Sequence, residues 1–251
     1  MPVLRGIGAK QALGPVLRRI YEKLRIERPT GRMPVLRGIG GGTGETPVLR
    51  GIYEKLRIEK GMSIIICPGF HGPELTEGFL EGLFENWRDL EESGDLFIFP
   101  AEDSAPYSAI DILNFLCCAK QPIAESGTET GLLFISFSAG AVGAIGAAWG
   151  WRQMGRRVKA FIAVDGWGMP LGGDFPIYRI SHDRFTHWSS ALLGGGQESF
   201  YADPAVEHLD LWRSPQTARG WWLNENVGAK TASPATAAEF VNQILKKHID
   251  N

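Results

Sequence analysis

The fold is decided by one stretch of the chain, Gly131-Leu-Leu-Phe-Ile-Ser-Phe-Ser138-Ala-Gly-Ala-Val-Gly-Ala-Ile-Gly-Ala-Ala-Trp149. Residues 131–135 form a short apolar run with the length and composition typical of a buried strand. After the small residues around Ser138, the chain continues with many alanines and glycines, which would allow a helix to pack close against a sheet. The stretch therefore predicts a strand, a sharp turn centred on Ser138 and a helix.

A serine at the centre of such a turn suggests a chemical role. Ser136-Phe-Ser138-Ala-Gly140 matches the G-x-S-x-G pattern of a nucleophile elbow, with serine in place of the first glycine. The elbow is a strained turn, so the positions two before and two after the nucleophile must be small, and both Ser136 and Gly140 are small. We interpret Ser138 as a candidate nucleophile. The alternative is an ordinary strand-to-helix turn that happens to contain a serine.

The chain on both sides of this stretch alternates between apolar runs and segments with apolar residues at helical spacing. The strands expected from the apolar runs are 63–67, 95–99, 131–135, 158–164, 175–181 and 199–202. The helices expected between them are 76–92, 108–120, 139–153 and 184–193, and two more are expected to begin at Ser214-Pro215 and Ser233-Pro234. This alternation predicts an α/β fold with a mostly parallel six-stranded sheet and helices on both faces.

The first 61 residues are a different kind of sequence. Residues 1–8 recur identically at 33–40, and residues 20–27 recur identically at 52–59. Residues 1–61 carry a net charge of +8, whereas the rest of the chain carries −10 and all eight tryptophans. We therefore expect 1–61 to be a low-complexity repeat tail, disordered or not part of the functional protein, and 62–251 to be the folded domain.

Composition narrows the class of protein further. Hydrophobic residues make up 44% of the chain and charged residues 22%, an ordinary globular mixture. No apolar run reaches about 18 residues, so no membrane span is expected, and the N-terminus lacks a signal pattern. The three cysteines, Cys67, Cys117 and Cys118, fit neither a disulfide framework nor a zinc site. We expect a cytoplasmic protein with reduced core thiols and without metal or cofactor. Nucleic-acid binding by the basic tail is an alternative that we do not favour.

A serine nucleophile needs a histidine base and an acid, and in a parallel sheet these groups should lie at the carboxyl ends of strands. The chain has five histidines, of which His248 falls in the terminal helix and is expected to be solvated. The other four follow predicted strands: His71, His182, His187 and His208. The acids at strand ends are Asp165, Asp183 and Asp203.

From Met62 onward, the chain resembles the compact α/β-hydrolases. The resemblance lies in the Gly69-Phe70 turn after the first strand, in the elbow, and in the order Ser, Asp, His along the chain. It implies Ser138 as nucleophile and His208 as base. It implies Asp183 as acid, because that family commonly places the acid after the second strand beyond the elbow strand. Asp165 is the alternative acid, since some members place it one strand earlier.

The resemblance also implies the remaining parts of the site. The backbone N–H groups of Phe70 and Ala139 would form the oxyanion hole, and His71, Trp167 and Trp188 would line the mouth of the pocket. The implied function is hydrolysis of an ester, thioester or related acyl bond in a small-molecule substrate, through an acyl-enzyme. The alternative is a non-catalytic protein of the same fold that binds a ligand or another protein.

Overall fold

The structure is a computed structural model that describes residues 62–119, 131–166, 168–194, 196, 198–224 and 231–249. These residues all belong to one compact unit, Glu45–Asn251. The predicted repeat tail, 1–61, and Trp167 lie outside the described residues.

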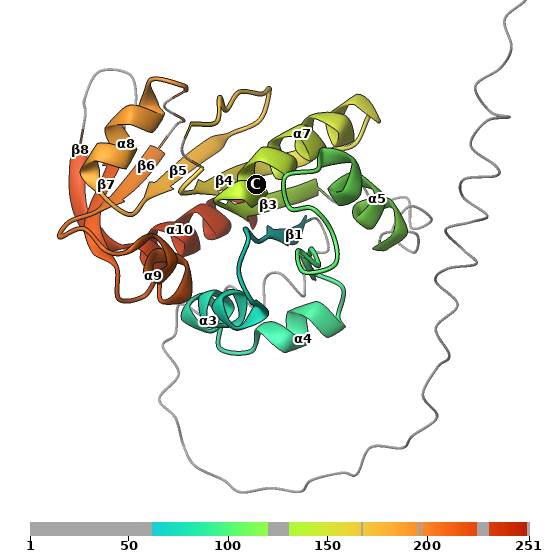
Figure 1. Cartoon of the computed structure of the whole chain (residues 1–251), viewed down its shortest axis with the longest axis horizontal. Helices are drawn as coiled ribbons and strands as arrows, with labels where there is room; N and C mark the ends of the chain where they lie inside the picture. The colour runs from blue at the N-terminus through green and yellow to red at the C-terminus, as the bar shows by residue number, and fades with distance from the viewer. Residues whose placement is uncertain are drawn as a thin grey trace, which may run out of the picture. The chain divides into compact units, whose positions relative to one another are not determined.

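The described residues form a single eight-stranded sheet between helices (Figure 1). Its strands are β1 (Met62–Cys67), β2 (Leu96–Ile98), β3 (Gly131–Phe137), β4 (Val158–Val164), β5 (Ile177–Ser181), β6 (Glu198–Ala202), β7 (Arg219–Asn224) and β8 (Thr231–Thr236). Their order is β2-β1-β3-β4-β5-β6-β7-β8, in which β1 to β6 pair in parallel and β7 pairs antiparallel with both β6 and β8. The predicted α/β class and mostly parallel sheet are confirmed.

The predicted number of six strands is wrong. A turn at 215–217 and then β7 follow Ser214, where the first closing helix was expected, and β8 contains Ser233-Pro234, the expected start of the second. Trp222 on β7 packs edge-on against Phe240, with 5.4 Å between ring centroids, whereas the neighbouring Trp221 is 37% exposed. This in-and-out alternation is the pattern of a half-buried strand. Pro234 lies on β8, opposite Trp221, and a strand at the edge of a sheet tolerates a proline that has no N–H to donate.

The last helix, α10 (Ala237–Ile249), consequently begins three residues after Pro234. Thr236 and Glu239 form a reciprocal capping box at its start. The Glu239 N–H donates to Thr236 Oγ1 at 3.1 Å, and the Thr236 N–H donates to Glu239 Oε2 at 2.7 Å. The Ser-Pro signal was therefore wrong here, and the threonine with a glutamate three residues later marks the helix start.

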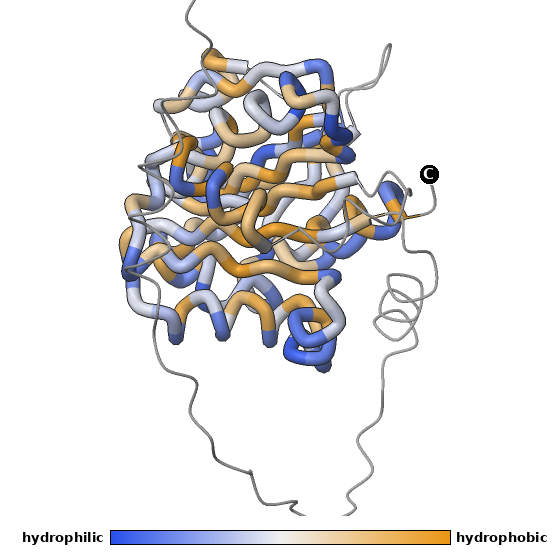
Figure 2. Tube along the Cα trace, turned by 90° about the vertical axis from the view of Figure 1, so that its right-hand side faces the viewer, coloured by the Kyte–Doolittle hydropathy of each residue, from blue (hydrophilic) through white to orange (hydrophobic). Residues whose placement is uncertain are grey.

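Helices cover both faces of the sheet. The helices before α10 are α3 (Pro73–Leu83), α4 (Trp87–Glu92), α5 (Ala109–Ala119), α7 (Ala139–Gln153), α8 (Arg184–Ala191) and α9 (His208–Arg213). Helices α5, α7 and α8 lie on one side, and α3, α4, α9 and α10 lie on the other (Figure 1). Each side has its own buried apolar cluster, and the strands between them are largely apolar along the trace (Figure 2). The single helix expected at 76–92 is divided in two by residues 84–86.

The strand order creates a crevice beside β1, where the chain stops adding strands on one side of the sheet and begins adding them on the other. From β1, the chain adds β2 on one side and then returns to add β3 on the other. Ligands in such sheets bind outside the carboxyl ends of the two strands that flank the reversal. Here those ends lead into residues 68–72 after β1 and into Ser138 after β3.

Two expectations about burial need correction. Only Cys67 is a core thiol, and burial raises its pKa; Cys117 and Cys118 are exposed on α5. His248 is buried rather than solvated, and its Nε2 lies 2.9 Å from the Tyr178 hydroxyl. Burial lowers the pKa of His248 to about 4. None of the helices in the described part of the chain is long and apolar enough to cross a membrane.

Candidate active site

Ser138 occupies a strained turn between β3 and α7. Its φ of 52° and ψ of −122° lie in a region that residues other than glycine rarely adopt, and such strain concentrates at functional sites. The backbone on both sides is held in place, because the Ser138 N–H donates to Val164 O at 3.0 Å and the Ser138 carbonyl accepts from the Ala141 N–H at 3.0 Å. The strand, turn and helix predicted from the sequence are confirmed.

The residues two positions away from Ser138 are small for separate reasons. A Cβ on Gly140 would lie 2.3 Å from the carbonyl oxygens of both Cys67 and Pro68, so helix α7 can start against the end of β1 only with glycine there. Ser136 is completely buried, and its hydroxyl donates to the carbonyl of Ile162 on β4 at 3.1 Å. The serine that replaces the first glycine of the elbow motif is therefore accommodated by a hydrogen bond across the sheet.

This bond makes a modest prediction for Ser136→Ala. Removing the hydroxyl should lower the free energy of unfolding by about 1 kcal/mol, the net value of an ordinary intramolecular hydrogen bond. The elbow should survive, because alanine is also small. Urea denaturation measures the first effect, and the φ and ψ angles of Ser138 in a crystal structure of the variant measure the second. A variant as stable as wild type would show that the bond contributes nothing.

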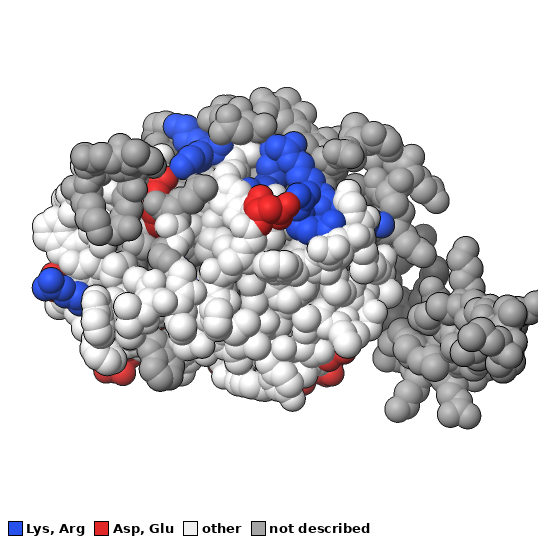
Figure 3. Space-filling view, turned by 90° about the horizontal axis from the view of Figure 1, so that it is seen from above, with Lys and Arg blue, Asp and Glu red and all other residues white. Residues whose placement is uncertain are grey.

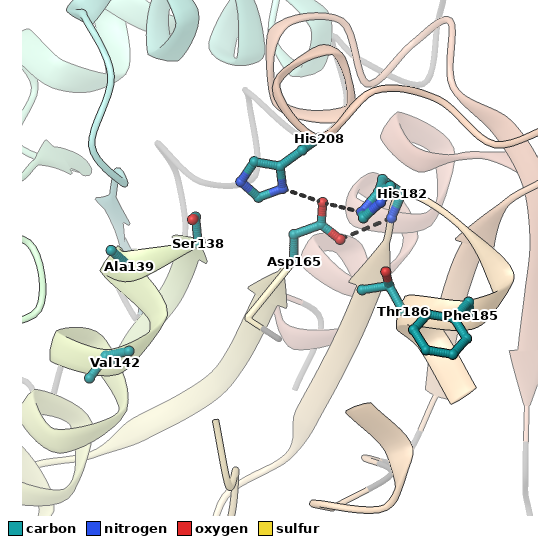
Figure 4. Close-up of a pocket in the computed structure, with 8 residues that line it drawn as sticks. All are labelled: Ser138, Ala139, Val142, Asp165, His182, Phe185, Thr186 and His208. Carbon is teal, nitrogen blue, oxygen red and sulfur yellow. Dashed lines mark hydrogen bonds and ion pairs between the residues drawn. The ribbon is translucent and has the colours of Figure 1, made fainter. Parts of the chain in front are cut away.

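Ser138 opens into a pocket of about 420 Å³ at the carboxyl ends of β3, β4 and β5. All of the residues that line it are drawn in Figure 4: Ser138, Ala139, Val142, Asp165, His182, Phe185, Thr186 and His208. Two of the predicted triad residues, Ser138 and His208, are therefore brought together although they are far apart in the chain.

The acid in contact with His208 is Asp165. Its side chain, at the end of β4, is 1% exposed, and its Oδ2 lies 2.8 Å from His208 Nδ1. Asp183, the first choice from the sequence, instead accepts the Thr186 N–H at 2.6 Å as the N-cap of α8. The structure therefore places Asp165, the alternative acid from the sequence, and not Asp183, in contact with His208. Both aspartates follow a strand, but α8 begins directly after Asp183 and uses its carboxylate.

Packing fixes the plane of the His208 ring. The ring stacks on Phe137, with 4.6 Å between centroids and 24° between planes, and Phe137 in turn stacks on Trp212 at 4.9 Å. In Figure 4, the His208 ring lies between Asp165 and Ser138, with Nδ1 toward the carboxylate and the opposite edge of the ring toward the serine hydroxyl.

His182 is a second histidine on the same carboxylate. Its Nδ1 lies 2.8 Å from Asp165 Oδ2, and its backbone N–H donates to Asp165 Oδ1 at 2.9 Å. From the sequence, His182 was only one of several possible bases and was assigned no role. Its position directly after β5, beside a strand-end aspartate, was the available signal.

These bonds decide the charge of the acid. Burial by itself would raise the pKa of the Asp165 carboxyl, but the hydrogen bonds from His182 and His208 outweigh it and hold this pKa below its ordinary value. The bond to Asp165 raises the pKa of His182, against an opposing effect of burial. An ionised carboxylate can only accept, so both Nδ1 atoms donate, and the neutral form of the His208 ring has its lone pair on Nε2.

The same three residues could in principle hold a metal ion. Asp165, His182 and His208 offer ligand atoms within 4.8 Å of one another, and they form the one such group found among the described residues. However, both Nδ1 atoms lie 2.8 Å from a single oxygen, Oδ2, which is the spacing of a hydrogen bond. A protonated Nδ1 has no lone pair to give a metal. The arrangement is a hydrogen-bonded cluster around an anion.

The predicted oxyanion residues lie close to Ser138. Ala139 lines the pocket as the first residue of α7, where a backbone N–H has no acceptor within the helix. Phe70 follows Gly69, and a Cβ on Gly69 would lie 3.1 Å from the Cβ of Ser138. The loop after β1 thus runs directly past the serine. The Phe70 side chain itself is 67% exposed and lies beside Tyr107.

Neither His71 nor Trp188, both predicted at the mouth of the pocket, lines it. His71 lines a different cavity, together with Trp87, and Trp188 is 60% exposed and does not line the pocket. The third, Trp167, lies outside the described residues. The apolar lining comes instead from Val142 and Phe185. Phe185 is on the first turn of α8, next to the strand ends, whereas Trp188 lies almost a turn further along the helix.

Comparison with models of known protein families finds no family that matches this chain. Comparison with curated proteins likewise finds no similar sequence.

Proposed function

We propose that this protein is a serine hydrolase of the α/β-hydrolase type, which cleaves an ester, thioester or related acyl bond through an acyl-enzyme. The observation that carries the proposal is the placement of Ser138. It sits at φ 52° on a strand-to-helix turn, in one pocket with a histidine that is hydrogen-bonded to a buried aspartate. Nucleophile, acid and base occur in the order Ser138, Asp165, His208, which is the order of that class of enzyme.

In the proposed reaction, Ser138 Oγ attacks the carbonyl carbon of the substrate while His208 Nε2 takes the hydroxyl proton. Asp165 holds the other ring nitrogen and stabilises the imidazolium that forms. The tetrahedral intermediate collapses as the imidazolium gives its proton to the leaving alcohol or thiol, which leaves an acyl group on Ser138. Water, deprotonated by the same histidine, then attacks the acyl carbon and releases the acid and the free serine.

The negative charge on the tetrahedral oxygen needs donors that are already in place. The N–H of Ala139 is at the N-terminus of α7, where the helix dipole also favours negative charge. The second donor would be the N–H of Phe70, on the loop that Gly69 brings against Ser138. Loss of one such donor typically costs about 3 kcal/mol of barrier.

The lining favours an uncharged acyl group. Val142 and Phe185 offer apolar side chains to the pocket. On the face seen in Figure 3, the Lys and Arg side chains gather mainly near one edge, and most of the remaining described surface is uncharged. An acyl chain that enters between Val142 and Phe185 would be removed from water, at about 25 cal/mol per Å² of apolar surface buried. We propose a small, apolar acyl substrate.

A fluorophosphonate probe tests the proposal directly. The wild-type protein should be labelled, because the probe traps a serine whose proton is removed by a neighbouring base. Ser138→Ala should not be labelled at all. A matched control is Ser189→Ala, which removes a hydroxyl on α8 outside the pocket and should leave labelling unchanged. p-Nitrophenyl esters of increasing chain length then define the acyl preference. Folded wild-type protein that neither labels nor hydrolyses any of these esters would favour a binding protein of the same fold.

A further inference from the structure

His182 is hydrogen-bonded to the proposed acid and to the segment that carries the proposed base. Its imidazole and its backbone N–H both donate to the Asp165 carboxylate, at 2.8 and 2.9 Å. Its carbonyl oxygen accepts the N–H of Val206 at 3.0 Å, two residues before His208. One residue at the end of β5 therefore holds the acid and also anchors the segment that carries the base.

We propose that His182 is a positioning residue whose imidazole orients Asp165 and whose charge sets how strongly that carboxylate supports His208. The inference rests on the proposed function, because it concerns the same acid and base.

The orienting part of this role belongs to the side chain. Asp165 accepts three hydrogen bonds, and two of them converge on Oδ2 from His182 and His208. Without the His182 ring, His208 would be the only side chain bonded to Oδ2, and His208 is the ring that Asp165 has to orient. The His182 ring fixes the same oxygen from the other side (Figure 4). Because the backbone bonds of His182 do not need its side chain, the effect of the ring can be separated from the fold.

The charge part follows from how close the groups are. The two imidazole centroids lie 5.9 Å apart, with the single carboxylate of Asp165 between them. The other charged groups that act on His182 are Asp183, whose Oδ2 lies 3.7 Å from its Nε2, and Glu207. When His182 is neutral, Asp165 can stabilise the imidazolium that forms on His208. When His182 is an imidazolium, it neutralises the carboxylate and repels a second positive charge.

The sign of the pH dependence is then fixed. The hydrogen bond to Asp165 raises the pKa of His182 above its ordinary value, so His182 takes up a proton early as the pH falls. The supporting effect of Asp165 is complete well above that pKa and weakens below it. Activity in the wild type should therefore fall on the acid side with protonation of two histidines, and more steeply than for a single base.

His182→Asn separates the two parts. The asparagine Nδ2 can replace the Nδ1–H donor, but it does not titrate. We expect kcat/KM of His182→Asn to stay within about threefold of wild type near pH 8.5, where both side chains are neutral donors. Near pH 5.5, kcat/KM of the variant should be about tenfold higher than that of wild type, after correction for any difference at pH 8.5. The reason is that the repulsion between charges about 6 Å apart is removed. The fall of its kcat/KM at acid pH should follow a single ionisation.

His182→Ala removes the donor as well. It should have a kcat/KM about tenfold below that of His182→Asn at every pH, mainly through kcat, because Asp165 is less well oriented. The control is His187→Gln, which removes a histidine on α8 whose Nε2 lies 2.9 Å from Ser199 Oγ, outside the pocket. Near-ultraviolet circular dichroism of each variant verifies that it is folded.

The measurement is the pH profile of ester hydrolysis and of fluorophosphonate labelling for all four proteins. A His182→Asn profile identical to that of wild type would overturn the role of the charge, and a fully active His182→Ala would overturn the role in orientation. A change of the same size in His187→Gln would also overturn the assignment to His182. A wild-type protein that is silent in both assays would refute the proposed function itself, which is a different result.

Discussion

Asp165→Asn should lower kcat/KM for ester hydrolysis about 10⁴-fold, the loss seen when the acid of a serine triad becomes an amide. Asparagine keeps the size of the side chain, but its amide presents a donor as well as an acceptor to His208 and His182. His208 would then be held in the wrong tautomer and the imidazolium would lose its counter-charge. KM should change little, because Asp165 does not contact substrate directly in the proposed reaction.

Asp183→Asn is the matched control for this substitution. It makes the same chemical change on the next strand, at a residue whose carboxylate caps α8 through the Thr186 N–H. Asparagine is as good an N-cap as aspartate, so both stability and activity should remain close to wild type. Steady-state kinetics on one ester settle the assignment: a large loss in Asp183→Asn with an active Asp165→Asn would restore the acid inferred from the sequence.

Local sequence patterns do not distinguish between these two aspartates. Apolar runs and helical spacing placed β1 to β6 and the elbow, because burial between two helical layers leaves a strong periodic signal. Both aspartates follow such strands, and both suit the chemistry. What separates them is that Asp165 Oδ2 lies 2.8 Å from the Nδ1 atoms of His182, just after β5, and His208, on α9, whereas Asp183 caps its own helix. That difference is a long-range contact, which no local pattern encodes.

The same limit explains the strands and pocket residues that were assigned wrongly. The Ser-Pro pair at Pro234 is a common helix start, yet here pairing with β7 overrides this local preference and places the proline on an edge strand. The resemblance implies Trp188 at the pocket mouth, but the start of α8 places Phe185 at the pocket instead. The sequence assigns no role to His182, because that role depends on a long-range contact with the carboxylate of Asp165, which follows another strand.

Gly140→Ala should disrupt the elbow by pushing the start of α7 away from the end of β1. The new Cβ would lie 2.3 Å from two backbone oxygens, those of Cys67 and Pro68, and neither can turn aside as a flexible side chain could. The start of α7 must therefore move away from the end of β1. Such overpacking costs about 1 to 3 kcal/mol, and the better helix propensity of alanine, about 1 kcal/mol, recovers only part of it.

The functional cost of Gly140→Ala should be larger than its cost in stability. Ser138 and the proposed donor Ala139 lie directly before Gly140, so a shift of the helix start moves the nucleophile relative to His208. A displacement of about 1 Å can cost 100-fold in rate, and we expect at least that loss in the rate of fluorophosphonate labelling. Gly172→Ala is the control, since a Cβ there meets nothing within 4 Å, and its labelling rate should be unchanged. If Gly140→Ala labels as fast as wild type, the close contact between β1 and α7 is not what holds Ser138 in place, and the strained turn must be maintained by the hydrogen bond from its N–H to Val164.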